Sequence, residues 1–404
     1  MPPFSLRQHR PLAFFIAARG AATLAYQMAG VAVGWQIYGL THRALDLGLV
    51  GLVQFIPSLL LTLYVGHLAD RHDRRRIVSF ALLAEAAALA GLAATTLLHG
   101  GSRETILLFV LAIGIGRAFE YSTMLALVPS LAEPEILPQA IAASSGVKQA
   151  ATIVGPVLGG FLYLAGPAAV YGTSFILFLF AAVTILCIRI RRIPPAREPI
   201  SIKTVFAGIG FIRSRPVLLG AVSLDLFAVL LGGATALLPI YARDILLTGP
   251  EGLGLLRGAP AVGALAASLY LARNPLRQRV GRVMFAAVAL FGAMTVVFAL
   301  SRSILLSFAA LAILGWADMI SIVIRASLIQ LETPDEMRGR VSAVNAIFVS
   351  SSNELGEFES GLTAAWFGAV PAALIGGIGT LVVVLIWMRL FPELLKRERL
   401  QGDG

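Results

Sequence analysis

Carboxylates gather inside an otherwise apolar stretch near the C-terminal end of the chain. They are Glu354, Glu357 and Glu359, with Asn353 beside them. In a helix Glu354 and Glu357 share a face with Asn353, whereas Glu359 points elsewhere. Two carboxylates one turn apart in a medium of low dielectric repel each other and lose hydration, so one of them can hold a proton near neutral pH. The pattern indicates a proton-exchanging site; a structural carboxylate paired with an arginine is the alternative.

Further ionisable residues stand within other apolar stretches, where they are costly and usually mark function. Arg117 and Glu120 are three residues apart, close enough to pair on a helix, either for function or as a structural ion pair. Asp318 and Arg325 are seven apart and therefore lie on one helix face, and Asp225 stands alone in an earlier stretch.

The elements that hold these residues must be membrane helices. Hydrophobic residues make up 58% of the 404, charged residues only 13%, and the mean hydropathy is +0.85. No soluble domain of this size needs so much apolar surface. A span needs about 20 mainly apolar residues. The chain offers twelve such windows, near 14–40, 45–68, 77–98, 104–128, 138–164, 168–190, 217–242, 252–273, 281–300, 303–328, 340–365 and 369–390.

The net charge of +10 is distributed as an orientation signal rather than as a nucleic-acid surface. With the N-terminus in the cytoplasm, the inner segments hold most of the arginines, and the outer loops hold only Arg43, Arg103, Arg243 and Arg302. We therefore expect both termini in the cytoplasm and no nucleic-acid partner. Cys187 is the single cysteine, the histidines lack ligand spacing, and no Walker lysine is present. The sequence predicts no metal site, no cofactor and no enzyme activity.

An internal repeat divides the spans into two sets of six. The segments 131–135 and 331–335 read Leu-Ala-Glu-Pro-Glu and Leu-Glu-Thr-Pro-Asp, each between two spans. The longest polar interruption separates the sets and contains apolar residues at helical spacing. That spacing favours a helix on the inner membrane surface, with a plain linker as the alternative. We predict an N-terminal half at 1–190, a central cytoplasmic loop at 191–216, a C-terminal half at 217–391 and a cytoplasmic tail at 392–404.

A charged hairpin between the second and third spans carries a resemblance to a known superfamily. The pattern G-x-x-x-D-R-x-x-R-R, formed by Gly66, Asp70, Arg71, Arg74 and Arg75, resembles the loop between helices 2 and 3 of major facilitator superfamily transporters. A membrane anchor obeying the positive-inside rule explains the arginines but not the glycine and the aspartate. In that superfamily the loop latches the inward gate, which would place Asp70 near the inner end of the eleventh span. Transport should then fall in Asp70→Asn.

The fifth span strengthens the resemblance. Gly155, Pro156, Gly159 and Gly160 are similar to the superfamily's antiporter-type motif, in which small residues let two helices approach closely. Short matches, among them the segment 333–340, resemble the enterobactin-exporter and drug-efflux group. The resemblance implies an all-α membrane protein with twelve transmembrane helices in two pseudo-symmetric halves and a substrate site between them.

In this fold spans 1, 4, 7 and 10 line the central cavity. The resemblance therefore implies that polar residues on those spans contact the substrate or the proton. These residues are Arg19, Tyr26, Gln27, Arg117, Glu120, Asp225, Asp318 and Arg325.

The resemblance implies a proton-coupled exporter of a small amphipathic or siderophore-like molecule in a bacterial inner membrane. The protein would work by rocker-switch alternating access, and a monomer suffices for that cycle. Its partners would be the small-molecule substrate, protons and the lipid bilayer. Two alternatives stay open: an importer or uniporter of a small solute, and a lysophospholipid transporter.

Overall fold

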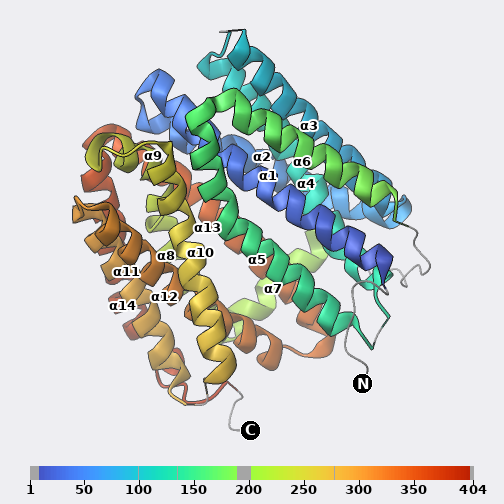
Figure 1. Ribbon diagram of the computed structural model, residues 1–404. Coiled ribbons are helices and arrows are strands. Elements are labelled where there is room, and N and C mark those ends of the chain that lie inside the picture. The colour runs from blue at the N-terminus through green and yellow to red at the C-terminus, as the bar shows by residue number, and fades with distance from the viewer. Residues whose placement is uncertain (1–8, 99, 134, 189–201, 277, 401–404) are drawn as a thin grey trace. The chain divides into compact units, whose positions relative to one another are not determined.

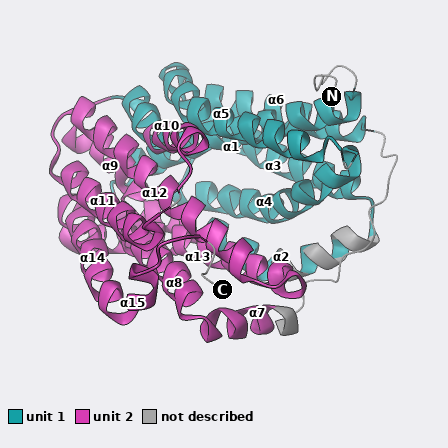
Figure 2. Cartoon of the chain, turned by 90° about the horizontal axis from the view of Figure 1, so that it is seen from below, with its two compact units in different colours: residues 1–42, 53–199, 249–258 teal, residues 43–52, 200–248, 259–404 magenta. Residues whose placement is uncertain are grey.

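The computed structural model describes residues 9–98, 100–133, 135–188, 202–276 and 278–400. The side chains of 62, 63, 66, 67, 69–71 and 202–204 lie outside this description. The described chain consists of helices joined by short loops, with no strand among these residues (Figure 1). It separates into two compact units (Figure 2). Unit 1 comprises residues 1–42, 53–199 and 249–258, and unit 2 comprises residues 43–52, 200–248 and 259–404.

The first six long helices come from the N-terminal part of the chain. They are α1 (Arg10–Thr41), α2 (Ala44–Arg71), α3 (Arg74–Leu97), α4 (Arg103–Leu131), α5 (Leu137–Leu162) and α6 (Pro167–Leu186), with a short 3₁₀ turn η1 (Tyr163–Ala165) after α5. Local chemistry sets several of these starts. The Ser102 hydroxyl accepts from the backbone N–H of Thr105 at 3.2 Å and caps α4. Gly166, at φ +103°, turns the chain directly before Pro167 begins α6.

The remaining elements follow the central segment. They are α7 (Ile202–Ser214), α8 (Pro216–Leu231), η2 (Ala234–Leu237), α9 (Leu238–Ile240), η3 (Tyr241–Ile245), α10 (Pro250–Arg273), α11 (Val280–Leu300), α12 (Ile304–Glu332), α13 (Asp335–Phe367), α14 (Ala369–Leu390) and α15 (Pro392–Leu395). The expected seventh span is therefore interrupted. Gly232 and Gly233 end α8, and a Cβ on Gly233 would lie 2.4 Å from the carbonyl oxygen of Gly356 in α13. The two glycines permit this close approach at the cost of helical regularity.

Eleven described helices are long and apolar enough to cross a membrane. The predicted span that falls short is the eleventh, at 340–365, which coincides with α13, a continuous helix of 33 residues. Its three glutamates and the polar residues around them keep its hydropathy below that of an ordinary span. The all-helical membrane architecture is thus confirmed, whereas the count of twelve apolar spans is not reached on hydropathy alone.

Close helix contacts in unit 1 run through the glycines of α5. A Cβ on Gly155 would lie 2.6 Å from Cβ of Gln27, and one on Gly159 would lie 2.8 Å from Cα of Met28, both in α1. On the neighbouring side, a Cβ on Gly160 would lie 2.4 Å from the carbonyl oxygen of Pro250 in α10. Because lipid is as apolar as a leucine side chain, such close packing is what holds membrane helices together. Gln27 therefore serves the α1–α5 contact.

Unit 2 is built around a core of large apolar side chains. Leu218 of α8, Phe285 of α11 and Ile324 of α12 are fully buried in one cluster that also includes Val384 of α14. The described part of the predicted tail, residues 392–400, packs on this unit, because Leu394 of α15 is fully buried as well. The Arg397 guanidinium donates to the Glu332 carboxylate at the end of α12, and the Gly281 N–H donates to the Arg397 carbonyl at 2.9 Å.

Candidate functional site

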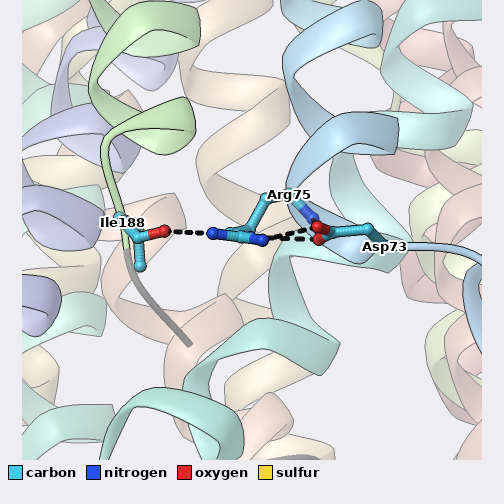
Figure 3. A network of polar contacts seen from close by, with 3 residues as sticks. All are labelled: Asp73, Arg75 and Ile188. Carbon is cyan, nitrogen blue, oxygen red and sulfur yellow. Dashed lines mark hydrogen bonds and ion pairs between the residues drawn. The ribbon is translucent and has the colours of Figure 1, made fainter. Parts of the chain in front are cut away.

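The charged hairpin between α2 and α3 is held by an aspartate that the motif does not single out. Asp73 is the N-cap of α3 and accepts from the backbone N–H of Arg75 at 3.0 Å. The Arg75 guanidinium contacts both Asp73 oxygens, at 3.1 and 2.6 Å, and donates to the Ile188 carbonyl at 2.5 Å (Figure 3). Arg75 thereby connects the start of α3 to the end of α6.

The electrostatics of this hairpin follow from the same contacts. The hydrogen bond from the Arg75 side chain holds the pKa of Asp73 below its usual value, although partial burial opposes the shift. Arg74 donates to the carbonyl of Ala126 in α4 at 3.0 Å. The two arginines therefore join α3 to two different helices. The side chains of Gly66, Asp70 and Arg71 lie outside the described residues, so the latch expected at Asp70 stays a prediction.

The polar residues of spans 1 and 4 come together in unit 1. Arg117 donates to Glu120 at 2.8 Å, with side-chain exposures of 23% and 6%. The Arg117 guanidinium carbon lies 4.0 Å from the centre of the Tyr26 ring, and the Tyr26 hydroxyl donates to Gln54 at 2.7 Å. The predicted pair thus exists, and an aromatic ring supports it from α1 by a cation–π contact.

Two more cations surround this pair. Arg19 of α1 donates to the Ser144 hydroxyl of α5 at 2.8 Å. Lys148, one turn along α5, places its ammonium 5.5 Å from the centre of the Tyr121 ring. Lys148 lies within electrostatic range of Arg19, Arg117 and Glu120. We call Arg19, Arg117 and Lys148, with Tyr26 and Tyr121, the cation–aromatic cluster. Lys148 and Tyr121 were not among the predicted site residues.

Glu85 of α3 is the buried acid that sequence reasoning missed. Its side chain is fully buried, and neither carboxyl oxygen has a hydrogen-bond partner among the residues that the structure describes. It lies against Gly116 of α4, where a Cβ would be 2.6 Å from Cγ of Glu85. The charges that act on it are those of Glu120 and Arg117. The signal was present, because Glu85 is the only ionisable residue between Ile77 and Leu98.

Unit 2 brings together the three charged residues predicted in spans 7 and 10. Arg325 of α12 donates to the Asp225 carboxylate of α8, and both side chains are 5% exposed. Asp225 and Asp318 line one small internal cavity with Ser321, Val288 and Phe291. Its volume of about 10 Å³ is close to the room that one water molecule needs. Arg325 thus pairs with Asp225, and Asp318 lies beside them on the same small, mainly apolar cavity. We call these residues the Asp225–Asp318–Arg325 triad.

The glutamates of α13 have a different environment. Glu359 accepts from the Thr363 hydroxyl of its own helix at 2.8 Å, which is a local contact. Glu357 packs against α2, because a Cβ on Gly51 would lie 2.9 Å from its Oε2. Asn353 is exposed and donates to the Val349 carbonyl at 2.9 Å. Glu354 and Glu357 are half-buried. The structure therefore does not place the α13 glutamates in the buried triad.

The helices and their intramembrane charges define a multi-pass membrane transporter, as the comparisons with known proteins also indicate. Residues 3–400 match the family described as transmembrane secretion effector, of the major facilitator superfamily. The chain belongs to this family. It moves a small molecule across a membrane and is a transporter rather than an enzyme, as the sequence predicts.

Enterobactin exporters of enteric bacteria are similar to this chain along almost its whole length. The enterobactin exporter EntS of Citrobacter koseri is 27% identical over 401 residues, which cover 96% of this chain and 94% of the relative. The enterobactin exporter of Salmonella typhimurium is 26% identical with the same coverage.

Solved transporter structures share the fold. A bacterial homologue of the lysosomal transporter Spinster, in an inward-facing and occupied conformation, superposes with a TM-score of 0.73 at 14% identity, covering 97% of both chains. A bacterial homologue of the iron transporter ferroportin gives a TM-score of 0.70 at 19% identity, covering 98% of this chain and all of the other, 100%. At these identities the likeness concerns the fold alone.

Proposed function

We propose that this protein is a proton-coupled exporter of a siderophore-like small molecule, working in a bacterial inner membrane with both termini in the cytoplasm. The main support for proton coupling is the Asp225–Asp318–Arg325 triad. Arg325 can neutralise one carboxylate, so the second carboxyl is the natural place for a proton that enters and leaves. The siderophore class rests on the relatives, which are enterobactin exporters.

The proposed cycle follows from charge balance in the triad. The proton reaches Asp318 or Asp225 from the outer side and leaves toward the cytoplasm, where cargo binds. The loaded protein then exposes cargo outside by rocker-switch alternating access, and a monomer completes the cycle. The small cavity gives room for a water that relays the proton. The hairpin, through Asp70 and the observed contacts of Arg74 and Arg75, biases the inward gate.

The α13 glutamates are the second candidates for the proton. Glu354 and Glu357 share a helix face, but they are less buried than Asp225 and Arg325, so the charged form of a carboxyl costs less free energy there. Asp318→Asn and Glu354→Gln therefore separate the two sites.

The test uses purified protein in proteoliposomes with iron-free enterobactin as cargo. With an acidic lumen, wild type should accumulate enterobactin against its gradient, and a protonophore should reduce this to equilibration. Asp318→Asn should equilibrate only, whereas Glu354→Gln should still accumulate. Accumulation that survives both the protonophore and Asp318→Asn contradicts coupling through the triad. Loss in Glu354→Gln alone moves the proton site to α13.

The same vesicles test the alternatives. An importer or uniporter equilibrates enterobactin, or another small solute, without responding to the pH gradient. A lysophospholipid transporter moves lysophosphatidylethanolamine in preference to enterobactin. Asp70→Asn should insert normally but transport more slowly. An unchanged transport rate would show that Asp70 does not latch the inward gate.

A further inference from the structure

The cation–aromatic cluster of unit 1 has more basic than acidic side chains around it. Its cations are Arg19 on α1, Arg117 on α4 and Lys148 on α5. The acids near it are Glu120, which is paired, and Glu85, which is fully buried. Neither α1 nor α5 contains an acidic residue. The cluster is therefore positive whether Glu85 is charged or neutral.

Within the described part of the chain, Arg19 and Lys148 form no ion pair with a carboxylate. Arg19 donates to a hydroxyl, not to a carboxylate. Lys148 has the Tyr121 ring as its contact, and among the described residues no carboxylate lies within ion-pair distance of it. A lysine within a membrane helix costs a few kcal/mol on insertion scales and is rarely retained without a role. An anionic group brought by cargo would supply the missing partner.

The aromatic rings add a second selection. Arg117 lies 4.0 Å from the Tyr26 ring centre and 6.0 Å from that of Tyr121. Tyr121 is itself 46% exposed, so part of its ring is accessible to a ligand. An exposed ring beside cations favours a flat aromatic molecule, which stacks on the tyrosine while its anionic groups contact the arginine and lysine.

We propose that the cation–aromatic cluster binds the cargo and that it selects anionic aromatic molecules over cationic ones of the same shape. This inference rests on the proposed export function, which it makes specific. Lys148 and Tyr121 act by direct contact with cargo. Glu120 keeps Arg117 in place between turns of the cycle, and cargo competes with Glu120 for the guanidinium.

The proposal is tested by equilibrium binding, with no ion gradient, so that its outcome is independent of proton coupling. Carboxyfluorescein and tetramethylrhodamine ethyl ester share a xanthene ring system and differ in the sign of their charge. Fluorescence polarisation with the full-length protein in detergent should show saturable binding of carboxyfluorescein and much weaker binding of the rhodamine ester. Equal binding of both dyes, or preference for the rhodamine ester, would overturn the selection by charge.

Variants assign the effect to residues. Lys148→Gln should weaken carboxyfluorescein binding about ten-fold, the loss of one charge-assisted contact, and Lys148→Arg should recover most of it. Tyr121→Leu should weaken binding, whereas Tyr121→Phe should not. The exposed Arg302→Ala, in unit 2, is the matched control and should bind as wild type does. If Lys148→Gln and Tyr121→Leu both bind like this control, the cluster is not the cargo site. If binding is as proposed but enterobactin transport ignores the pH gradient, the coupling fails and the cargo site stands.

Discussion

The helices α4 and α12 occupy corresponding places in the two halves of the sequence, yet they carry opposite charge at the same position. Both are 29 residues long, and Arg117 and Asp318 are each the fifteenth residue of their helix. Around Arg117 the structure gathers cations and aromatic rings, whereas around Asp318 it gathers a second carboxyl and one arginine. The same helix position thus carries a cation beside aromatic rings in unit 1 and a carboxyl beside a second carboxyl in unit 2.

The residue directly before the charged position also has different neighbours in the two helices. Gly116 and Ala317 are each the fourteenth residue, directly before the charged position. Gly116 accommodates the Glu85 side chain of α3. Ala317 borders the small cavity beside Val288 and Phe291 of α11. The acid beside the charged position thus comes from α3 in unit 1 and from α8 in unit 2.

Removing the arginine of the triad should have the largest effect on stability. Arg325→Ala leaves Asp225 buried without its partner, and breaking a buried pair in this way costs about 3–5 kcal/mol. Arg117→Ala breaks a pair within one helix, of which the arginine is partly exposed, and should cost less. Thermal unfolding in detergent measures both. The double variant Asp225→Asn, Arg325→Gln should recover much of the loss, and equal destabilisation by the two single variants would contradict the contrast between the units.

Removing the buried acid of unit 1 should change the free energy of unfolding only slightly, and in the stabilising direction. The Glu85 carboxyl accepts no hydrogen bond from any described residue, so Glu85→Leu removes a polar group that costs free energy to bury. The variant should leave stability unchanged or raise it by about 1 kcal/mol. Exposed Glu135→Gln is the control. A loss of stability comparable to that of Arg117→Ala would show instead that Glu85 is a favourable partner of Arg117.

The Asp73–Arg75 pair in the hairpin lies outside both clusters, and its loss should have the smallest destabilising effect. Because the pKa of Asp73 is lowered in the folded state, its contribution is full above the ordinary aspartate pKa of about 3.9 and is lost as pH falls through the lower folded value. Asp73→Asn should therefore lower stability by about 0.5–1 kcal/mol at neutral pH. Its effect should shrink on acidification. Thermal unfolding of both proteins against pH measures this, and a difference that grows toward acid pH would contradict the sign.

Much of this structure could be predicted from the sequence because membrane spans are recognisable by their length and apolar composition. The repeat and the glycine spacing of α5 were visible for the same reason, since both are local patterns. That Asp318 and Arg325 share a helix face also follows from spacing. The partner of Arg325, however, is Asp225, one hundred residues earlier, and only the packing of α8 against α12 brings them together.

The features that the sequence did not predict also have physical causes. The break after Leu231 is set by the approach of Gly233 to α13, which depends on tertiary packing. The motif drew attention to Asp70, while the described contacts of the hairpin are those of Asp73, a helix cap. Lys148 appears in sequence as a lone cation, and its place beside Arg19 and Arg117 depends on three helices meeting.

We propose that unit 1 binds cargo while unit 2 handles the proton, and one transport experiment separates the two roles. Enterobactin movement is followed in proteoliposomes as gradient-driven accumulation and as exchange of internal for external cargo without a pH gradient. Asp318→Asn should lose accumulation and keep exchange. Lys148→Gln should need about ten-fold more enterobactin for both and retain the response to the pH gradient. Loss of pH-dependence in Lys148→Gln, or unchanged accumulation in Asp318→Asn, would contradict this division.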